Sequence, residues 1–301
     1  MKKTLIITRY KLFFFFFDKI MPNTNYPDCV YHYTNGDAFL GMLKNQELWA
    51  SHILFQNDKK EAVHAYEILE KVLQEKKNDF SKYNLNIEKL YELIKVFKGQ
   101  DTFTLSFSEK KDDLNQWRSY ANTKPAYCIG FSPAALCQID INGNIKRNKS
   151  SGIRTIFYKC IYDEESQKKM IENLIDYVIE EKVKNQKTQV TEEGIYGYIL
   201  HDFLIMSVLF KHPAFAEEKE WRLFFSPVGN QLINIRMGKS NFIPYIKVPI
   251  KYNYIKELVI GPCADEEHIL NSTKYVYSFF TEEMSRRYDW KIESSTVPYR
   301  Q

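Results

Sequence analysis

The 301-residue sequence contains few glycines, and the motifs that glycine usually builds at nucleotide and catalytic sites are missing from it. The 11 glycines form no glycine-rich loop before a Lys-Ser/Thr pair, no G-x-G-x-x-G and no G-x-S-x-G, and the six histidines form no H-E-x-x-H. These absences argue against a P-loop, a Rossmann phosphate loop, a serine-hydrolase elbow and a zincin. No Pro/Gly/Ser-rich linker divides the chain either, so we expect a single domain.

Cysteine is also scarce. The chain has five cysteines, an odd number, and they are scattered along the sequence: Cys29, Cys128, Cys137, Cys160 and Cys263. Neither a disulfide framework nor a zinc site can be read from such spacing. We therefore expect a reducing, cytoplasmic location and no metal cofactor.

The chain also has no large excess of charge of one sign, because its 42 Lys and Arg residues are nearly balanced by 38 Asp and Glu residues. A net charge of +4 does not by itself indicate a nucleic-acid-binding protein, and the 44% of hydrophobic residues argues against disorder. Aromatic residues are abundant by comparison, with 21 Tyr, 21 Phe and 4 Trp. Aromatic side chains fill cores, but they also line pockets for flat ligands.

The N-terminal segment 1–20 resembles a signal peptide only superficially. Its apolar stretch is interrupted by Thr8-Arg9-Tyr10-Lys11 and stopped by Asp18-Lys19. It is too short to span a bilayer and has no small-residue cleavage site, so we expect no association with a membrane. We interpret residues 1–20 as a tail, or as a wrongly assigned start before Met21, and place the domain at residues 21–301.

Hydrophobic periodicity predicts both helices and strands, distributed along the whole chain. Helices are expected from about Ala38, after the turn and cap residues Asn35-Gly36-Asp37, and over 58–76, 87–97, 164–184, 198–210 and 264–279. Strands are expected at 31–34, 47–51, 102–108, 127–131, 153–161, 221–225, 244–250, 255–260 and 290–292. The interleaving predicts one α+β domain with a mixed or mostly antiparallel sheet and inserted helices.

Two of the predicted strands carry polar side chains on one face, and Glu218 and Glu220 would also point the same way if the strand at 221–225 began earlier. The strand at 102–108 alternates hydroxyl and apolar residues, so Thr104, Ser106 and Ser108 share a face that looks into a cleft or into water. In the first strand His32 and Thr34 share a face. A hydrogen-bonded core histidine and solvated glutamates at 218 and 220 would account for the same pattern without any ligand.

Several compact strings of residues resemble the uncharacterised bacterial family DUF2971. They run in order from residue 31 to residue 300 and comprise Tyr31-His32-Tyr33-Thr34, Leu48-Trp49-Ala50-Ser51 with Asn57-Asp58, Ser106-Phe107-Ser108-Glu109, Gln116-Trp117-Arg118, Cys128-Ile129-Gly130-Phe131, Lys211-His212-Pro213, Glu217-Glu218-Lys219-Glu220-Trp221-Arg222, Val259-Ile260-Gly261-Pro262 and Val297-Pro298-Tyr299-Arg300.

The order of these strings is also similar to that of the ADP-ribosyltransferase fold. In that fold an early strand carries a His or Arg near a Thr, a middle strand carries hydroxyl or aromatic residues, and a late strand carries a catalytic Glu. This resemblance implies that NAD is the co-substrate and that His32, Tyr33 and Thr34 line its site, with His32 and Thr34 bonded to the nicotinamide ribose or amide. It implies further that Glu220 binds the ribose 2′-hydroxyl and stabilises the oxocarbenium-like charge as the glycosidic bond breaks.

The same resemblance assigns the remaining candidates. Tyr120 or Tyr127 would stack on the nicotinamide ring, and Arg118 or Arg222 would pair with the pyrophosphate. Trp117, with Arg222 and the pair Asn57-Asp58, would contact the substrate.

The sequence leaves three functions open. The first is transfer of ADP-ribose to a macromolecule, or hydrolysis of NAD, as in a toxin or an antiphage effector. The second is a non-catalytic binding or regulatory module of the same fold. The third is a nucleic-acid-acting enzyme, which would need a divalent ion, and Asn57-Asp58-x-x-Glu61 is the candidate for holding it. The acceptor and the oligomeric state cannot be read from the sequence.

Overall fold

The structure is a computed structural model that describes residues 25–55, 59–97, 102–120, 125–139, 154–184, 190–226, 232–238, 240–282 and 289–298. Its strands are β1 (Val30–Asn35), β2 (Glu47–His52), β3 (Phe103–Ser108), β4 (Ala126–Phe131), β5 (Arg154–Lys159), β6 (Glu220–Ser226), β7 (Asn234–Met237), β8 (Phe242–Pro249), β9 (Ile255–Ile260) and β10 (Lys291–Ser294). Its α-helices are α2 (Gly36–Asn45), α3 (Lys59–Glu75), α4 (Lys77–Lys82), α5 (Ile87–Phe97), α6 (Leu114–Tyr120), α7 (Pro133–Leu136), α8 (Glu164–Ile179), α9 (Glu192–Ser207) and α10 (Glu266–Glu282).

The predicted α+β class is confirmed, because the strand pairs are antiparallel except for β9 with β10. The turn before α2 also forms as expected, since the Asn35 side chain accepts a hydrogen bond from Ala38 N at 3.0 Å. One helix starts earlier than its apolar pattern suggested: α9 begins at Glu192, where the Thr191 side chain caps it by accepting from Gly194 N. Short α4, α6 and α7 and the four-residue strand β7 were not expected.

The strands form one sheet in the order β10-β9-β4-β1-β3-β2-β8-β7, and β6 with β5 joins at β3. Strand β3 pairs with β6 along its whole length, from Phe103↔Phe225 to Ser108↔Glu220. On the other edge of β3, β1 pairs only at Tyr31↔Ser108, and β2 pairs only at the opposite end of β3. The sheet therefore opens between β1 and β2, and the middle of β3 borders the opening.

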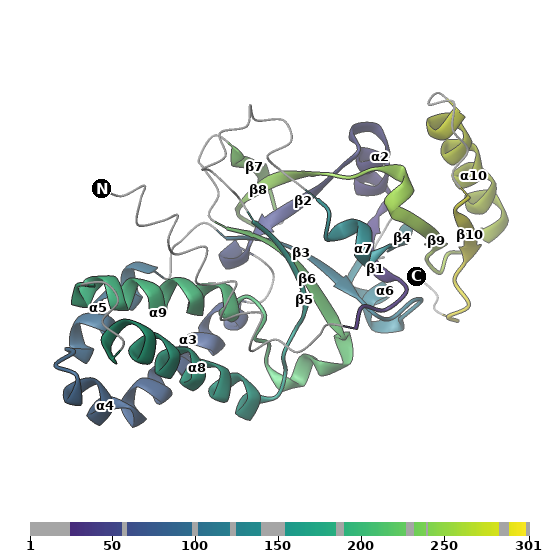
Figure 1. Ribbon diagram of the computed structural model, residues 1–301. Helices are drawn as coiled ribbons and strands as arrows, with labels where there is room; N and C mark the ends of the chain where they lie inside the picture. The colour runs from purple at the N-terminus through teal and green to yellow at the C-terminus, as the bar shows by residue number, and fades with distance from the viewer. Residues whose placement is uncertain are drawn as a thin grey trace.

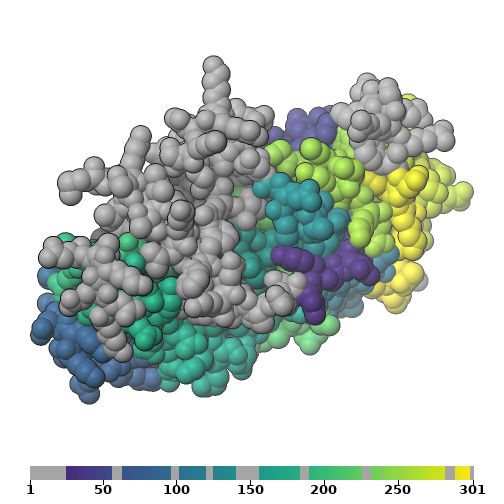
Figure 2. Space-filling view, viewed as in Figure 1, coloured from purple at the N-terminus to yellow at the C-terminus, as the bar shows by residue number. Residues whose placement is uncertain are grey.

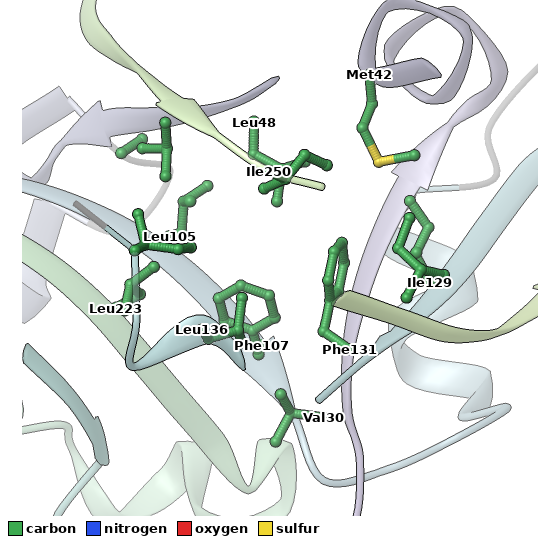
Figure 3. Packing of buried hydrophobic residues seen from close by; sticks show 14 of the residues in the cluster. Val30, Met42, Leu48, Leu105, Phe107, Ile129, Phe131, Leu136, Leu223 and Ile250 are labelled. Carbon is green, nitrogen blue, oxygen red and sulfur yellow. The ribbon is translucent and has the colours of Figure 1, made fainter. Parts of the chain in front are cut away.

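One face of the sheet holds the main hydrophobic core (Figure 3). Val30, Leu105, Phe107, Phe131 and Leu223 converge there from four strands, and Met42 of α2 and Leu136 of α7 close the cluster. These residues alternate along their strands with residues of the opposite face, as the period of two requires. The core thus fixes which side chains of β1, β3 and β6 turn to the other face.

A second core lies among the helices rather than on the sheet. Helices α3, α4, α5, α8 and α9 gather at one end of the molecule (Figure 1), and their buried residues form a separate cluster that includes Leu69, Leu90, Leu174 and Phe203. In the space-filling view this helical layer, blue to green, lies at the end opposite the yellow C-terminal segment (Figure 2). Within the described ranges, no helix combines the length and the apolar character that a bilayer crossing demands.

Candidate functional site

A cavity of about 860 Å³ occupies the opening of the sheet. Its walls come from β1, β2, β3 and β6, with contributions from α2, α6, β7 and the turn before β6. Its polar and aromatic lining includes Tyr31, His32, Tyr33, Thr34, Trp49, Ser51, Thr104, Ser106, Ser108, Asn115, Gln116, Ser119, Lys211, Phe215, Glu218, Glu220, Arg222 and Arg236. Its volume is that of a site for a small molecule or cofactor.

The hydroxyl face of β3 lines this cavity. Thr104, Ser106 and Ser108 all contribute to its lining. The hydroxyl face therefore looks into a cleft and not merely into bulk water. Ser108 is fixed at one end, where its Oγ donates to Glu218 O at 2.7 Å and accepts from Lys110 N at 3.0 Å. Paired residues of neighbouring strands share a face, so Glu220 and Arg222 of β6 lie beside Ser108 and Ser106.

His32 lies where the ladder between β1 and β3 ends. Its Nδ1 is 2.9 Å from the carbonyl oxygen of Ser106, which can only accept, so Nδ1 carries the proton of this hydrogen bond. Burial lowers the pKa of His32, and the backbone bond only partly offsets this effect. The imidazole is therefore neutral near pH 7, and its Nε2 has the chemistry of an acceptor.

Glu220 is the centre of a buried ionic triad. Its Oε2 accepts from Lys211 Nζ at 2.6 Å and from Arg222 Nη2 at 3.0 Å, and its Oε1 accepts from Arg222 Nε at 2.7 Å. All three residues are buried. Burial alone would raise the pKa of Glu220, but the charges of Arg222 and Lys211 hold that pKa at about 2. The carboxylate is thus ionised at any physiological pH.

Neighbouring groups fix the backbone around this triad. Gln167 of α8 donates through Nε2 to the carbonyl oxygen of Lys211 at 2.9 Å, and its Oε1 lies 2.9 Å from Nε2 of His64 on α3. The Tyr162 hydroxyl accepts from Glu220 N at 2.8 Å. The helical layer is therefore connected by hydrogen bonds to the charged wall of the cavity.

The structure does not bring Trp117, Arg118 or Tyr127 to the cavity. Trp117 is fully buried against Tyr33 in a small separate cluster, and its Nε1 donates to Asp112 at 2.7 Å. Arg118, the next residue of α6, is exposed, since each helical residue turns about 100° from the one before. Tyr127 packs in the main core, stacked on Phe39 with 4.4 Å between ring centroids.

Three other candidates cannot be placed. Tyr120 ends α6, but its side chain lies outside the described part of the structure, as do Asn57 and Asp58 altogether. His32, Tyr33, Thr34, Glu220 and Arg222 do line one cavity.

Several lining residues were missed by the sequence reasoning. Asn115, Gln116 and Ser119 share the face of α6 that looks into the cavity, a spacing that only a known helix phase would have revealed. Arg236 comes from β7 and lies in none of the strings, and Trp49 of β2 stands in a string that was noted without a role for this residue. Lys211 stands in a string that was noted, without a role. Among the described residues no group of three or more His, Cys, Asp or Glu side chains is arranged to hold a metal ion.

The fold and the cavity define an α+β protein whose mostly antiparallel sheet opens around a charged, hydroxyl-rich site. The model of the family DUF2971, proteins of unknown function, matches residues 116–223, which confirms the resemblance over that segment of the chain. This matched segment contains most of α6, all of β4 and β5, and the Lys211, Glu220 and Arg222 triad. No curated protein and no solved structure matches the chain.

Proposed function

We propose that this protein binds NAD in the cavity and transfers the ADP-ribose moiety to a macromolecule or to water, as an ADP-ribosyltransferase-like enzyme. One observation carries the proposal: His32 and Thr34 of β1, the hydroxyl residues of β3 and Glu220 of β6 all line a single cavity of about 860 Å³. Because Tyr31 pairs with Ser108, His32 and Thr34 border this cavity from the face of Phe107, and Ser108 and Glu220 border it from the opposite face.

Glu220 has the charge that the reaction requires. The bond between ribose C1′ and the nicotinamide nitrogen breaks with its electron pair on nicotinamide, and positive charge develops on the ribose ring. The nucleophile then forms a bond to C1′ and loses a proton. An ionised carboxylate next to the ring stabilises this charge. Oε1 of Glu220 accepts a hydrogen bond from Arg222 Nε, and a carboxylate oxygen can accept a second one from the ribose 2′-hydroxyl.

His32 and Thr34 would position the leaving group. A neutral His32 with its proton on Nδ1 presents Nε2 as an acceptor for an amide N–H or a ribose hydroxyl. Lys211 and Arg222 are already committed to Glu220, so in this proposal they keep the carboxylate ionised rather than bind the pyrophosphate.

The direct test is release of nicotinamide from NAD by the purified protein, with transfer of labelled ADP-ribose to lysate as a second readout. Glu220→Gln should lower the rate by about 100-fold or more, because it removes the charge that stabilises the transition state. Glu217→Gln is the matched control, since Glu217 lies close by with 85% of its side chain exposed. A wild-type protein that neither binds NAD nor releases nicotinamide would refute the proposal, as would a folded Glu220→Gln variant with wild-type activity.

A non-catalytic NAD-binding module is the second candidate. It is favoured by the closure of the Lys211, Glu220 and Arg222 triad, which resembles a structural ion network. In that case NAD binds without release of nicotinamide. If turnover is observed, the role that fits this reaction class is a toxin or antiphage effector, and production of the wild type in bacteria should lower their NAD pool.

A further inference from the structure

Arg236 is a cavity-lining cation with hydrogen-bonding capacity left over. It lies on the edge strand β7, between the outward-facing Ile235 and Met237, which are 68% and 69% exposed, so its side chain turns to the opposite face. There Nη2 donates to Ser51 Oγ at 3.1 Å across the neighbouring strand. Its Nε is buried, yet no described residue accepts a hydrogen bond from it.

The other two cations of the cavity are in a different situation. Lys211 forms ion pairs with Glu218 and Glu220, and Arg222 pairs with Glu220. Arg236, in contrast, forms no ion pair with a carboxylate of the described residues. A buried N–H of a charged group without an acceptor is costly, so a group that supplies acceptors there would be bound favourably.

An exposed aromatic ring lies two residues along β2 from Ser51, the hydrogen-bond partner of Arg236. Trp49 is two residues before Ser51 on β2, so both side chains lie on the face of the sheet that Arg236 reaches. Trp49 stacks on Tyr245 with 4.4 Å between ring centroids, lines the cavity and is 44% exposed. A planar guanidinium beside an exposed indole suits a phosphate attached to a nucleobase, since the guanidinium fork binds phosphate oxygens and the ring stacks on the base.

We infer that Arg236 anchors the phosphate groups of a nucleoside diphosphate or dinucleotide in this cavity, with the base against Trp49. The inference deepens the proposed function and shares its site, because NAD contains an adenosine diphosphate moiety. It differs from the sequence expectation, which gave the pyrophosphate to Arg118 or Arg222.

The test is a titration of the full chain with ADP, inorganic pyrophosphate, adenosine and NAD, by calorimetry and by tryptophan fluorescence. Trp117, Trp221 and Trp290 are buried, so quenching by the adenine-containing ligands should report Trp49 and should vanish in Trp49→Phe. Arg236→Gln should weaken binding of ADP and pyrophosphate by about 10- to 100-fold, because it removes charge-assisted hydrogen bonds, while adenosine binding is unchanged. The affinity of Arg236→Lys for ADP and pyrophosphate should fall between those of the wild type and Arg236→Gln. Arg118 is exposed on α6, so Arg118→Gln should bind with the affinity of the wild type.

The outcomes separate this inference from the proposed function. Wild-type protein that binds neither ADP nor pyrophosphate overturns the inference, and so does a folded Arg236→Gln variant with wild-type affinity for both. If ADP binds through Arg236 but NAD is neither bound nor cleaved, the phosphate site stands and the proposed function fails. If NAD is cleaved and Arg236→Gln leaves its KM unchanged, the proposed function stands and the phosphate site is elsewhere.

Discussion

Replacing Glu220 by Gln should destabilise the protein by about 3 kcal/mol at pH 7. The pKa of Glu220 is about 2 in the folded chain against an ordinary value of 4.5, because Arg222 and Lys211 outweigh the effect of burial. At about 1.4 kcal/mol for each pH unit of difference, this corresponds to about 3 kcal/mol. It agrees with the cost of about 3 to 5 kcal/mol for removing one partner of a buried ion pair.

The pH dependence of this loss has a defined sign. A carboxyl whose folded pKa lies below its unfolded pKa contributes its full stability above the unfolded value of 4.5, and loses it as pH falls toward 2. The difference in unfolding free energy between wild type and Glu220→Gln should therefore be constant from about pH 8 to pH 6, and should shrink to about 2 kcal/mol near pH 3.5.

Urea unfolding followed by circular dichroism measures both quantities. Lys211→Met should cost less than Glu220→Gln, because Glu220 keeps its hydrogen bonds from Arg222 Nε and Nη2. Glu217→Gln, at an exposed site, should leave stability close to that of the wild type. A Glu220→Gln variant within about 1 kcal/mol of wild type at pH 7, or a difference independent of pH, would refute the reasoning.

Two further predictions concern His32 and Asp112. Burial lowers the pKa of His32 below 6.5, so His32 takes up a proton in the unfolded chain before it does so in the folded chain as pH falls. Wild type should therefore lose stability relative to His32→Gln below about pH 6.5, by at most about 1.4 kcal/mol per pH unit. Parallel profiles of unfolding free energy against pH for the two proteins would contradict this. Asp112 accepts from Trp117 Nε1 at 2.7 Å and from Thr296 N at 2.8 Å, and it has a φ of 58°, which Asn also tolerates. Asp112→Asn should therefore lose about 1 to 3 kcal/mol through hydrogen bonding alone, and should speed proteolysis of the segment after β10; unchanged urea midpoint and cleavage rate would show that these bonds are dispensable.

The elements with strong periodicity were predictable from the sequence. The alternation at 102–108 gave both the strand β3 and its hydroxyl face, and Asn35-Gly36-Asp37 gave the start of α2. Local chemistry decides these features, because an alternating strand or a capped helix is specified within a few residues.

The neighbours of each strand were not predictable. β3 meets β6 more than 100 residues later in the chain, and the opening between β1 and β2 follows from long-range pairing alone. Trp117 was expected in the site because its string is polar and aromatic, but the phase of the seven-residue helix α6 turns it inward. Arg236 was missed since a four-residue strand is too short for a periodic signal.

The position of β3 has a consequence for synthesis of the chain. Ser108 Oγ donates to Glu218 O across 110 residues of sequence, and every residue pair between β3 and β6 has a similar separation in sequence. At about 5 to 20 residues per second, β3 leaves the ribosome roughly 5 to 25 seconds before β6 can cover its edge. During that interval a strand that reads Phe-Thr-Leu-Ser-Phe-Ser presents unpaired backbone groups, which favours association between nascent chains. The yield of folded protein should therefore depend on chaperones that act during translation, and growth at lower temperature should increase that yield.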